Sequence, residues 1–170
     1  MTQLAEPTTP PPRVVRTVVD IAAPPARVFE ALTDPRRLAA WWGGDGARVL
    51  DCDADVRPGG AWRVRTAEPP NGAEREAAGE YRVVDPPRRL EQSWRATGDE
   101  GPSVVRYDLE PLDVGGADGT RLTVTHTGPS APSACATRMR LTRALAGLGH
   151  RVRPIWCGAP TRRAIHTAIA

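Results

Sequence analysis

The stretch VVDIAAPPARVFEALTDPRRLAAWWG, which spans residues 18–43, decides how the fold begins. Its first residues continue a run in which β-branched side chains alternate with charged ones, a pattern that predicts a strand over Val14–Ile21. Pro24 and Pro25 then break the strand. Proline fits the first turn of a helix, because an N–H there has no partner inside the helix. A strand that passes directly into a helix is therefore expected.

Two short helices are predicted after this strand. The first ends near Thr33, and one apolar stripe at helical spacing lies along it, formed by Val28, Phe29 and Leu32. Asp34-Pro35 ends this helix, because a residue before proline avoids the α region. The second helix is expected over residues 36–42, and Gly43-Gly44 ends it.

From residue 47 onward, apolar residues recur with a period of two, which is typical of half-buried strands. Six strands are predicted, over residues 47–53, 61–66, 76–84, 90–95, 105–110 and 121–126. The connections are rich in proline and glycine, and the loops expected at residues 68–75 and 113–119 have hairpin length. Consecutive strands joined in this way form an antiparallel sheet.

A long helix is expected over residues 133–148, where a stripe returns to helical spacing at Cys135, Met139, Thr142 and Leu145. One long helix after an antiparallel meander covers one face of the sheet. The expected fold class is α+β, in a single domain over residues 13–148. Residues 1–12, dominated by proline and threonine, predict a disordered lead-in, and residues 149–170 form a tail of uncertain structure.

The chain carries 23 basic residues, all of them arginine, and 20 acidic residues interleaved with them. Arginine clusters contact phosphates in nucleic-acid-binding proteins. The interleaving of charge instead favours a bias in composition, and no nucleic-acid partner is expected. No stretch is apolar enough to predict a membrane helix, and the N-terminus does not resemble a signal peptide. A cytoplasmic monomer or homodimer is expected.

Neither a metal site nor a cofactor is expected. The three cysteines lack the spacing of zinc ligands or of a disulfide framework: Cys52, Cys135 and Cys157. Asp51, Asp53 and Asp55 alternate along a predicted strand and its exit, which fits either a cation site or a solvated strand edge. The strand edge is favoured, because an EF-hand needs a further acidic ligand and a glycine turn.

Four segments of the chain resemble, in order, those of a known superfamily. The first is the stretch at residues 18–43. The others are PGGAWR at 58–63, GEY at 79–81 continuing through PPRRL at 86–90 to Trp94, and GTRLTV at 119–124. Together they are similar to the SRPBCC superfamily of START-like and Bet v 1-like domains. Within it, they resemble the branch named after the C-terminal domain of the activator of Hsp90 ATPase.

The resemblance implies a helix-grip fold, in which a curved antiparallel sheet wraps around a long C-terminal helix and two small helices close one end. It also implies an elongated cavity that takes hydrophobic or aromatic small molecules. The branch has no universal catalytic residues, so none is assigned. The chain departs from the family at Arg140-Leu141, where a Gly-Trp pair is usual, and at residues 149–170, which extend past the usual end.

Eight residues are expected to line this cavity and to bind a ligand: Trp42, Trp62, Tyr81, Gln92, Trp94, Tyr107, His126 and Met139. The tryptophans fit an aromatic-lined pocket and also ordinary core packing. The two tyrosines and the glutamine fall on predicted inward faces, where they would orient a ligand by hydrogen bonds. His126 is either a general acid–base group or a hydrogen-bonded core residue.

Three functions compete at this point. The leading hypothesis is non-catalytic binding of a small hydrophobic or aromatic molecule between the sheet and the C-terminal helix. The second is an enzyme of the cyclase or hydrolase kind that uses His126 with Tyr81 or Tyr107. The third is an interaction module for an Hsp90-like chaperone, with a role in the stress response.

Overall fold

The computed structural model describes residues 14–42, 46–99 and 101–128. Its elements follow in the order β1 (Val14–Ile21), α1 (Pro25–Thr33), α2 (Pro35–Trp42), β2 (Arg48–Ala54), β3 (Ala61–Glu68), β4 (Ala73–Asp85), β5 (Arg89–Ala96), β6 (Ser103–Val114) and β7 (Ala117–Thr127). The two helices predicted after the first strand are confirmed. The lead-in expected at residues 1–12, the helix expected at residues 133–148 with Met139, and the tail at residues 149–170 lie outside the described residues.

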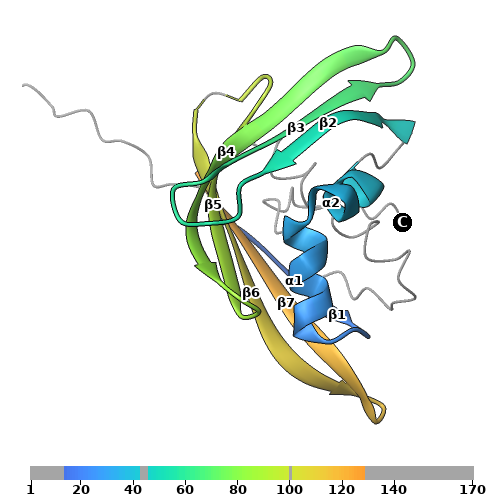
Figure 1. The fold of residues 1–170 in the computed structure, drawn as a ribbon, viewed down its shortest axis with the longest axis vertical. Helices are drawn as coiled ribbons and strands as arrows, with labels where there is room; N and C mark the ends of the chain where they lie inside the picture. Colours follow the sequence, from blue (N-terminus) through green and yellow to red (C-terminus); the bar gives the residue numbers. More distant parts are fainter. Residues whose placement is uncertain (1–13, 43–45, 100, 129–170) are drawn as a thin grey trace, which may run out of the picture.

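The strands form one antiparallel sheet with the order β1-β7-β6-β5-β4-β3-β2. Strands β2 to β7 follow one another as hairpins, and β1 returns to pair with β7. The two strands that flank the helices therefore occupy opposite edges of the sheet. The sheet is curved, and α1 and α2 lie on its concave side (Figure 1). This is the α+β arrangement expected from the sequence, as far as the described residues reach.

Two hairpins are tighter than the sequence predicts. The loop expected at residues 68–75 is shorter, because β4 already begins at Ala73. The turn expected at residues 113–119 contains only Gly115-Gly116 between the paired strands β6 and β7. Both glycines have positive φ angles, 64° and 88°, which a two-residue hairpin turn requires. The flanking polar residues belong to the strands instead of the turn.

Alternation along the strands puts the core on the concave face. On β5, Leu90, Gln92 and Trp94 are buried, and the residues between them are more exposed. The same alternation buries Tyr107 on β6 and Val124 on β7. The apolar stripe of α1 packs onto this face, because Val28, Phe29 and Leu32 are all buried. The predicted inward faces of these strands are therefore confirmed.

Asp34 separates the two helices and stabilises both ends of the junction. Its backbone N–H donates to Glu30 O at the end of α1. Its carboxylate Oδ1 accepts the N–H groups of Arg36 and Arg37, at 2.8 and 3.1 Å, at the start of α2. Trp41 Nε1 on α2 donates to Ala31 O on α1 at 2.8 Å, and this hydrogen bond is a second connection between the helices.

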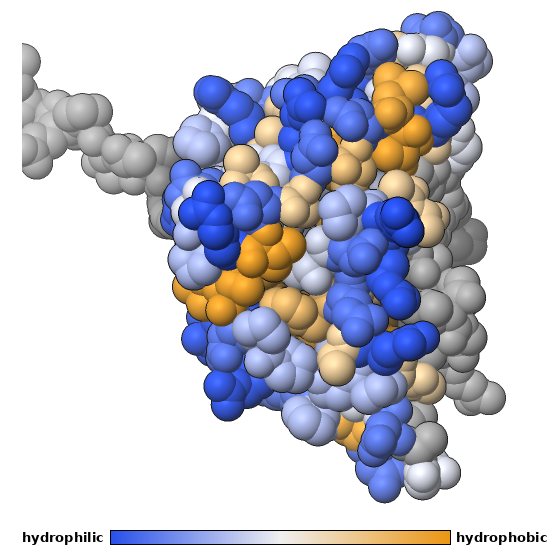
Figure 2. All heavy atoms as spheres, viewed as in Figure 1, coloured by the Kyte–Doolittle hydropathy of each residue, from blue (hydrophilic) through white to orange (hydrophobic). Residues whose placement is uncertain are grey.

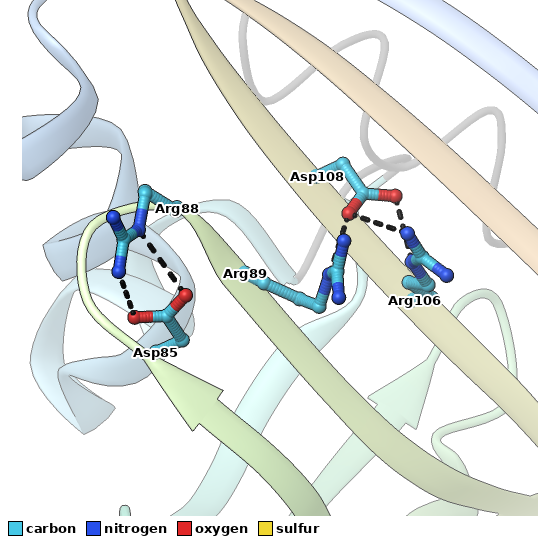
Figure 3. A network of polar contacts seen from close by, with 5 residues as sticks. All are labelled: Asp85, Arg88, Arg89, Arg106 and Asp108. Atoms are coloured by element: carbon cyan, nitrogen blue, oxygen red, sulfur yellow. Dashed lines mark hydrogen bonds and ion pairs between the residues drawn. The ribbon is translucent and has the colours of Figure 1, made fainter.

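Ion pairs between neighbouring strands cover the convex face. Asp108 on β6 accepts hydrogen bonds from Arg89 on β5 and from Arg106, each with a shortest distance of 2.8 Å (Figure 3). Partial burial alone would raise the pKa of Asp108, but the bonds from Arg106 and Arg89 hold this pKa below its ordinary value. Asp20 on β1 binds Arg121 on β7 through two N–H groups. Hydrophilic residues accordingly cover much of the surface seen in Figure 2, and apolar residues form separate patches.

Replacing Asp34 with alanine removes the side-chain acceptor at the start of α2. The free energy of unfolding should fall by about 1 kcal/mol, the usual value of an N-cap. Urea denaturation measures this change. Asp34→Asn is the matched control, because its amide oxygen keeps the acceptor, and it should lose much less stability. Equal losses in the two variants would show that the cap contributes nothing.

Candidate functional site

Four tryptophans from α2, β3 and β5 meet on the concave face. Trp42 stacks on Trp94, with ring centroids 5.3 Å apart and an interplanar angle of 19°. Trp62 lies against both rings, at 5.8 Å from Trp42 and 5.0 Å from Trp94. Trp41 extends the cluster, 5.3 Å from Trp42. The structure thus brings together the three tryptophans expected at the site and adds Trp41. We call these four residues the tryptophan cluster: Trp41, Trp42, Trp62 and Trp94.

A glycine on β4 makes room for this cluster. Gly79 pairs with Trp62 across the two strands, and Trp62 Nε1 donates to Ser93 O at 3.2 Å. A Cβ atom at position 79 would overlap Ser93 O and would lie 2.8 Å from Trp62 Nε1. Only glycine therefore lets the indole cross β4 and reach the backbone of β5.

A small pocket of about 10 Å³ remains beside the cluster. Its lining includes Tyr81, Gln92 and Tyr107, the three polar residues that the sequence places on inward faces. A volume of this size holds about one water molecule, so the tryptophans and their neighbours fill most of the space. The cluster therefore serves as core packing in this structure, the alternative that the sequence left open.

The three polar residues of the pocket are almost completely buried. Tyr81, Gln92 and Tyr107 are 1%, 4% and 3% exposed. No side-chain hydrogen bond joins any of them to another described residue. Burial raises the pKa of both tyrosines well above the ordinary value, with smaller additions from Cys52 for Tyr81 and from Tyr81 for Tyr107. Both phenols are therefore protonated and able to donate.

His126 lies on the inward face of β7 and is 2% exposed. Its Nε2 is 2.6 Å from Ser103 Oγ, a partner that sequence analysis missed. Burial lowers the pKa of His126, and the negative charge of nearby Asp99 offsets only part of this effect. The imidazole is therefore neutral at pH 7. No hydrogen bond joins His126 to Tyr81 or Tyr107 among the described residues. Among the described residues, the side-chain partner of His126 is therefore Ser103.

The remaining polar candidates are explained by ordinary contacts. Arg63 bonds Asp51 at 2.8 Å and Asp53 at 3.1 Å, which identifies this strand edge as an ion-pair network. Within the described part of the chain, no group of three or more acidic, histidine or cysteine residues is placed to hold a metal ion. Burial and the nearby Asp53 and Asp51 raise the pKa of Cys52 to about 11, so its thiol is protonated and unreactive.

A larger hollow, of about 450 Å³, lies between the start of α1 and the β6–β7 hairpin. It contains none of the residues expected at the site, and it is lined by Pro24, Pro25, Pro111, Leu112, Asp113, Gly116, Asp118 and Gly119. Asp113 is already engaged there, because its Oδ1 accepts the N–H of Gly116 at 2.8 Å. The tryptophan cluster is therefore the better candidate for a functional site.

Replacing Gly79 with alanine should displace Trp62 from Ser93 and lower the free energy of unfolding by about 1–3 kcal/mol, as overpacking usually does. Urea denaturation measures the loss, and near-ultraviolet circular dichroism reports the rearranged tryptophans. Gly101→Ala is the control, because a Cβ atom there meets nothing within 4 Å. A Gly79→Ala variant as stable as Gly101→Ala would contradict this account of the cluster.

Comparisons with solved structures agree with this fold. A protein from Chromobacterium violaceum is 26% identical, with a TM-score of 0.66, over 79% of this chain and 96% of that one. A protein from Micromonospora echinospora is 28% identical, with a TM-score of 0.58, over 81% and 74%. An Hsp90 activator from Plasmodium falciparum is 17% identical, with a TM-score of 0.61, over 82% and 99%, and shares the fold.

Among curated proteins, none matches this chain. No helix in the described part of the chain is long and apolar enough to cross a membrane. The sequence model of one family, described as activator of Hsp90 ATPase homolog 1-like protein, matches residues 22–150. This match covers more than half of the 170 residues and includes the helices, the tryptophan cluster and the strands that carry the polar residues. The chain therefore belongs to the family of activator of Hsp90 ATPase homolog 1-like proteins.

Proposed function

We propose that this protein binds a small aromatic or hydrophobic molecule against the concave face of its sheet, beside the tryptophan cluster. The observation that carries the proposal is the convergence of four indole rings from three separate elements on one face. Small-molecule sites are mostly apolar and aromatic, with a few polar groups that fix orientation. Membership of the family supports the same conclusion through the shared fold.

The polar residues of the pocket support binding over packing alone. Tyr81 and Tyr107 offer donors, and Gln92 offers both a donor and an acceptor, within one pocket. A ligand with polar groups at matching positions would form hydrogen bonds with these side chains. These side chains would then set the orientation of the ligand, while the tryptophans supply the contact area.

Entry of a molecule larger than water requires the cluster to open. Trp41 and Trp42 both lie at the end of α2, whereas Trp62 and Trp94 belong to strands within the sheet. A shift of α2 would therefore separate the rings without disturbing the strand pairing. The stack of Trp42 on Trp94 would be replaced by a stack of the ligand on Trp94.

Titration with aromatic probes such as naphthalene should quench tryptophan fluorescence in a saturable manner. Trp42→Ala should tighten binding by about tenfold, because the ligand no longer has to displace this ring from Trp94. Val83→Ala is the control, since Val83 is among the exposed large hydrophobic residues, and it should bind like the wild type. Absence of saturable binding across a broad panel of aromatic compounds would refute the proposal.

A second candidate function is the stimulation of an Hsp90-like ATPase, which the description of the matched family favours. The convex face would be the docking surface, because its neighbouring strands carry exposed arginines such as Arg89 and carboxylates such as Asp108. Such a partner would recognise the charged residues of β5 and β6. A cytoplasmic location and a monomeric or homodimeric state fit either function and stay predictions.

Addition of the protein to its host Hsp90-like chaperone should raise ATP hydrolysis severalfold if this second function holds. Arg89→Glu should then reduce the stimulation, since it reverses the charge that pairs with Asp108 on the convex face. Trp42→Ala, on the opposite face, is the matched control and should leave the stimulation intact. An unchanged ATPase rate at saturating protein would remove this candidate.

A further inference from the structure

Two buried nitrogen atoms beside the tryptophan cluster have no hydrogen-bond partner. They are Trp94 Nε1 and His126 Nδ1. The two rings are neighbours, with centroids 6.0 Å apart and an interplanar angle of 62°. Both residues lie on the concave face, and Trp94 also stacks on Trp42. Since nearly all buried polar groups in native proteins are hydrogen-bonded, two unpartnered atoms on neighbouring rings are suited to bind a polar group of a ligand.

The hydrogen bonds of Ser103 determine which ring nitrogen of His126 carries the proton. Ser103 Oγ is 2.6 Å from His126 Nε2 and 3.4 Å from the backbone oxygen of Trp94. A hydroxyl has one proton, so it satisfies both contacts only if it donates to Trp94 O and accepts from Nε2–H. The opposite tautomer would leave an N–H group buried without an acceptor. Because the buried imidazole is neutral, Nε2 carries its proton and Nδ1 presents a lone pair.

The face therefore offers one donor, the indole N–H of Trp94, next to one acceptor, His126 Nδ1. A hydroxyl group is complementary to this pair, because it accepts one hydrogen bond and donates another. A carboxylate or an ether only accepts, and an ammonium group only donates. To bond both groups, the hydroxyl oxygen would have to lie about 2.9 Å from each nitrogen, the usual length of such hydrogen bonds.

We propose that Trp94 and His126 recognise a hydroxyl group on an aromatic ligand, so that the ligand class is a phenol or a similar hydroxylated ring. This inference rests on the proposed function. The ring of the ligand stacks on the tryptophan cluster, and its hydroxyl accepts from Trp94 Nε1 and donates to His126 Nδ1. Ser103 acts as a positioning residue, because its contact with Nε2 selects the tautomer that accepts at Nδ1.

The test compares 1-naphthol, 1-methoxynaphthalene and naphthalene on the wild-type protein by calorimetry. 1-Naphthol should bind about tenfold more tightly than naphthalene, and the methyl ether should lose this advantage because it cannot donate. Equal affinities for 1-naphthol and naphthalene would overturn the inference while leaving the proposed function in place. That result would assign the two nitrogens to a bound water. If no naphthalene derivative binds, both the inference and the proposed function fail.

Trp94→Phe removes the indole N–H and keeps an aromatic ring, so it should reduce the preference for 1-naphthol severalfold and change naphthalene binding less. Trp62→Phe is the matched control, because its N–H is already bonded to Ser93 O. It should weaken both probes alike and preserve their ratio. Circular dichroism checks that each variant is folded. A Trp94→Phe variant that is folded and keeps the wild-type ratio would also overturn the inference.

Discussion

The stack of Trp42 on Trp94 is the contact that joins the helices to the middle strand of the sheet, and the concave face is organised around it. β1 and β2 lie at opposite edges of the sheet, so the helices between them must cross its concave face. Trp42 is the last residue of α2, and Trp94 belongs to β5, the middle strand of seven. Their rings, 5.3 Å apart, connect the end of α2 to the centre of the sheet. The same contact closes the space in which we propose that a ligand binds.

Polar groups are paired on the convex face of the sheet, whereas some are left without a partner on the concave face. On the convex face, carboxylates such as Asp20, Asp51 and Asp108 each have an arginine partner. Exposed pairs of this kind contribute only about 0–1 kcal/mol each, so they mainly order the surface. On the concave face, polar atoms of Trp94 and His126 are buried without partners. A chain that pairs its exposed charges and leaves buried polar atoms unpaired departs from what stability alone requires.

Most of this fold can be predicted from the sequence, because the patterns that mark its helices and strands are local. The stripe of α1 and the Asp34-Pro35 junction depend only on neighbouring residues, and both are confirmed. The strand ends at the hairpins are predicted less accurately, because the polar residues beside Gly115-Gly116 are also common in loops. In each hairpin the pairing of the strands continues past the point where the apolar alternation ends.

The partner of His126 could not be found in the same way. Ser103 follows a glycine and a proline, and it lies before the strand that the sequence predicts from residue 105. Its role depends on the register of β6 and β7, in which Val105 faces His126 and puts residue 103 two positions away on the same face. The tryptophan cluster likewise depends on the path of α2 across the sheet, which no local pattern encodes. Candidate residues were therefore predictable one by one, whereas their contacts were not.

The combination of stacked rings and unpaired polar atoms determines what kind of selectivity this face can provide. Aromatic stacking tolerates many ring systems, so the tryptophans by themselves would discriminate weakly between ligands of similar size. An unpaired donor and acceptor beside them act differently, because an analogue without the matching group leaves both atoms buried and unbonded. The low dielectric of the buried site strengthens the hydrogen bonds of a ligand that does match. Under our proposal, the cluster supplies affinity, and the pair formed by Trp94 and His126 selects the ligand.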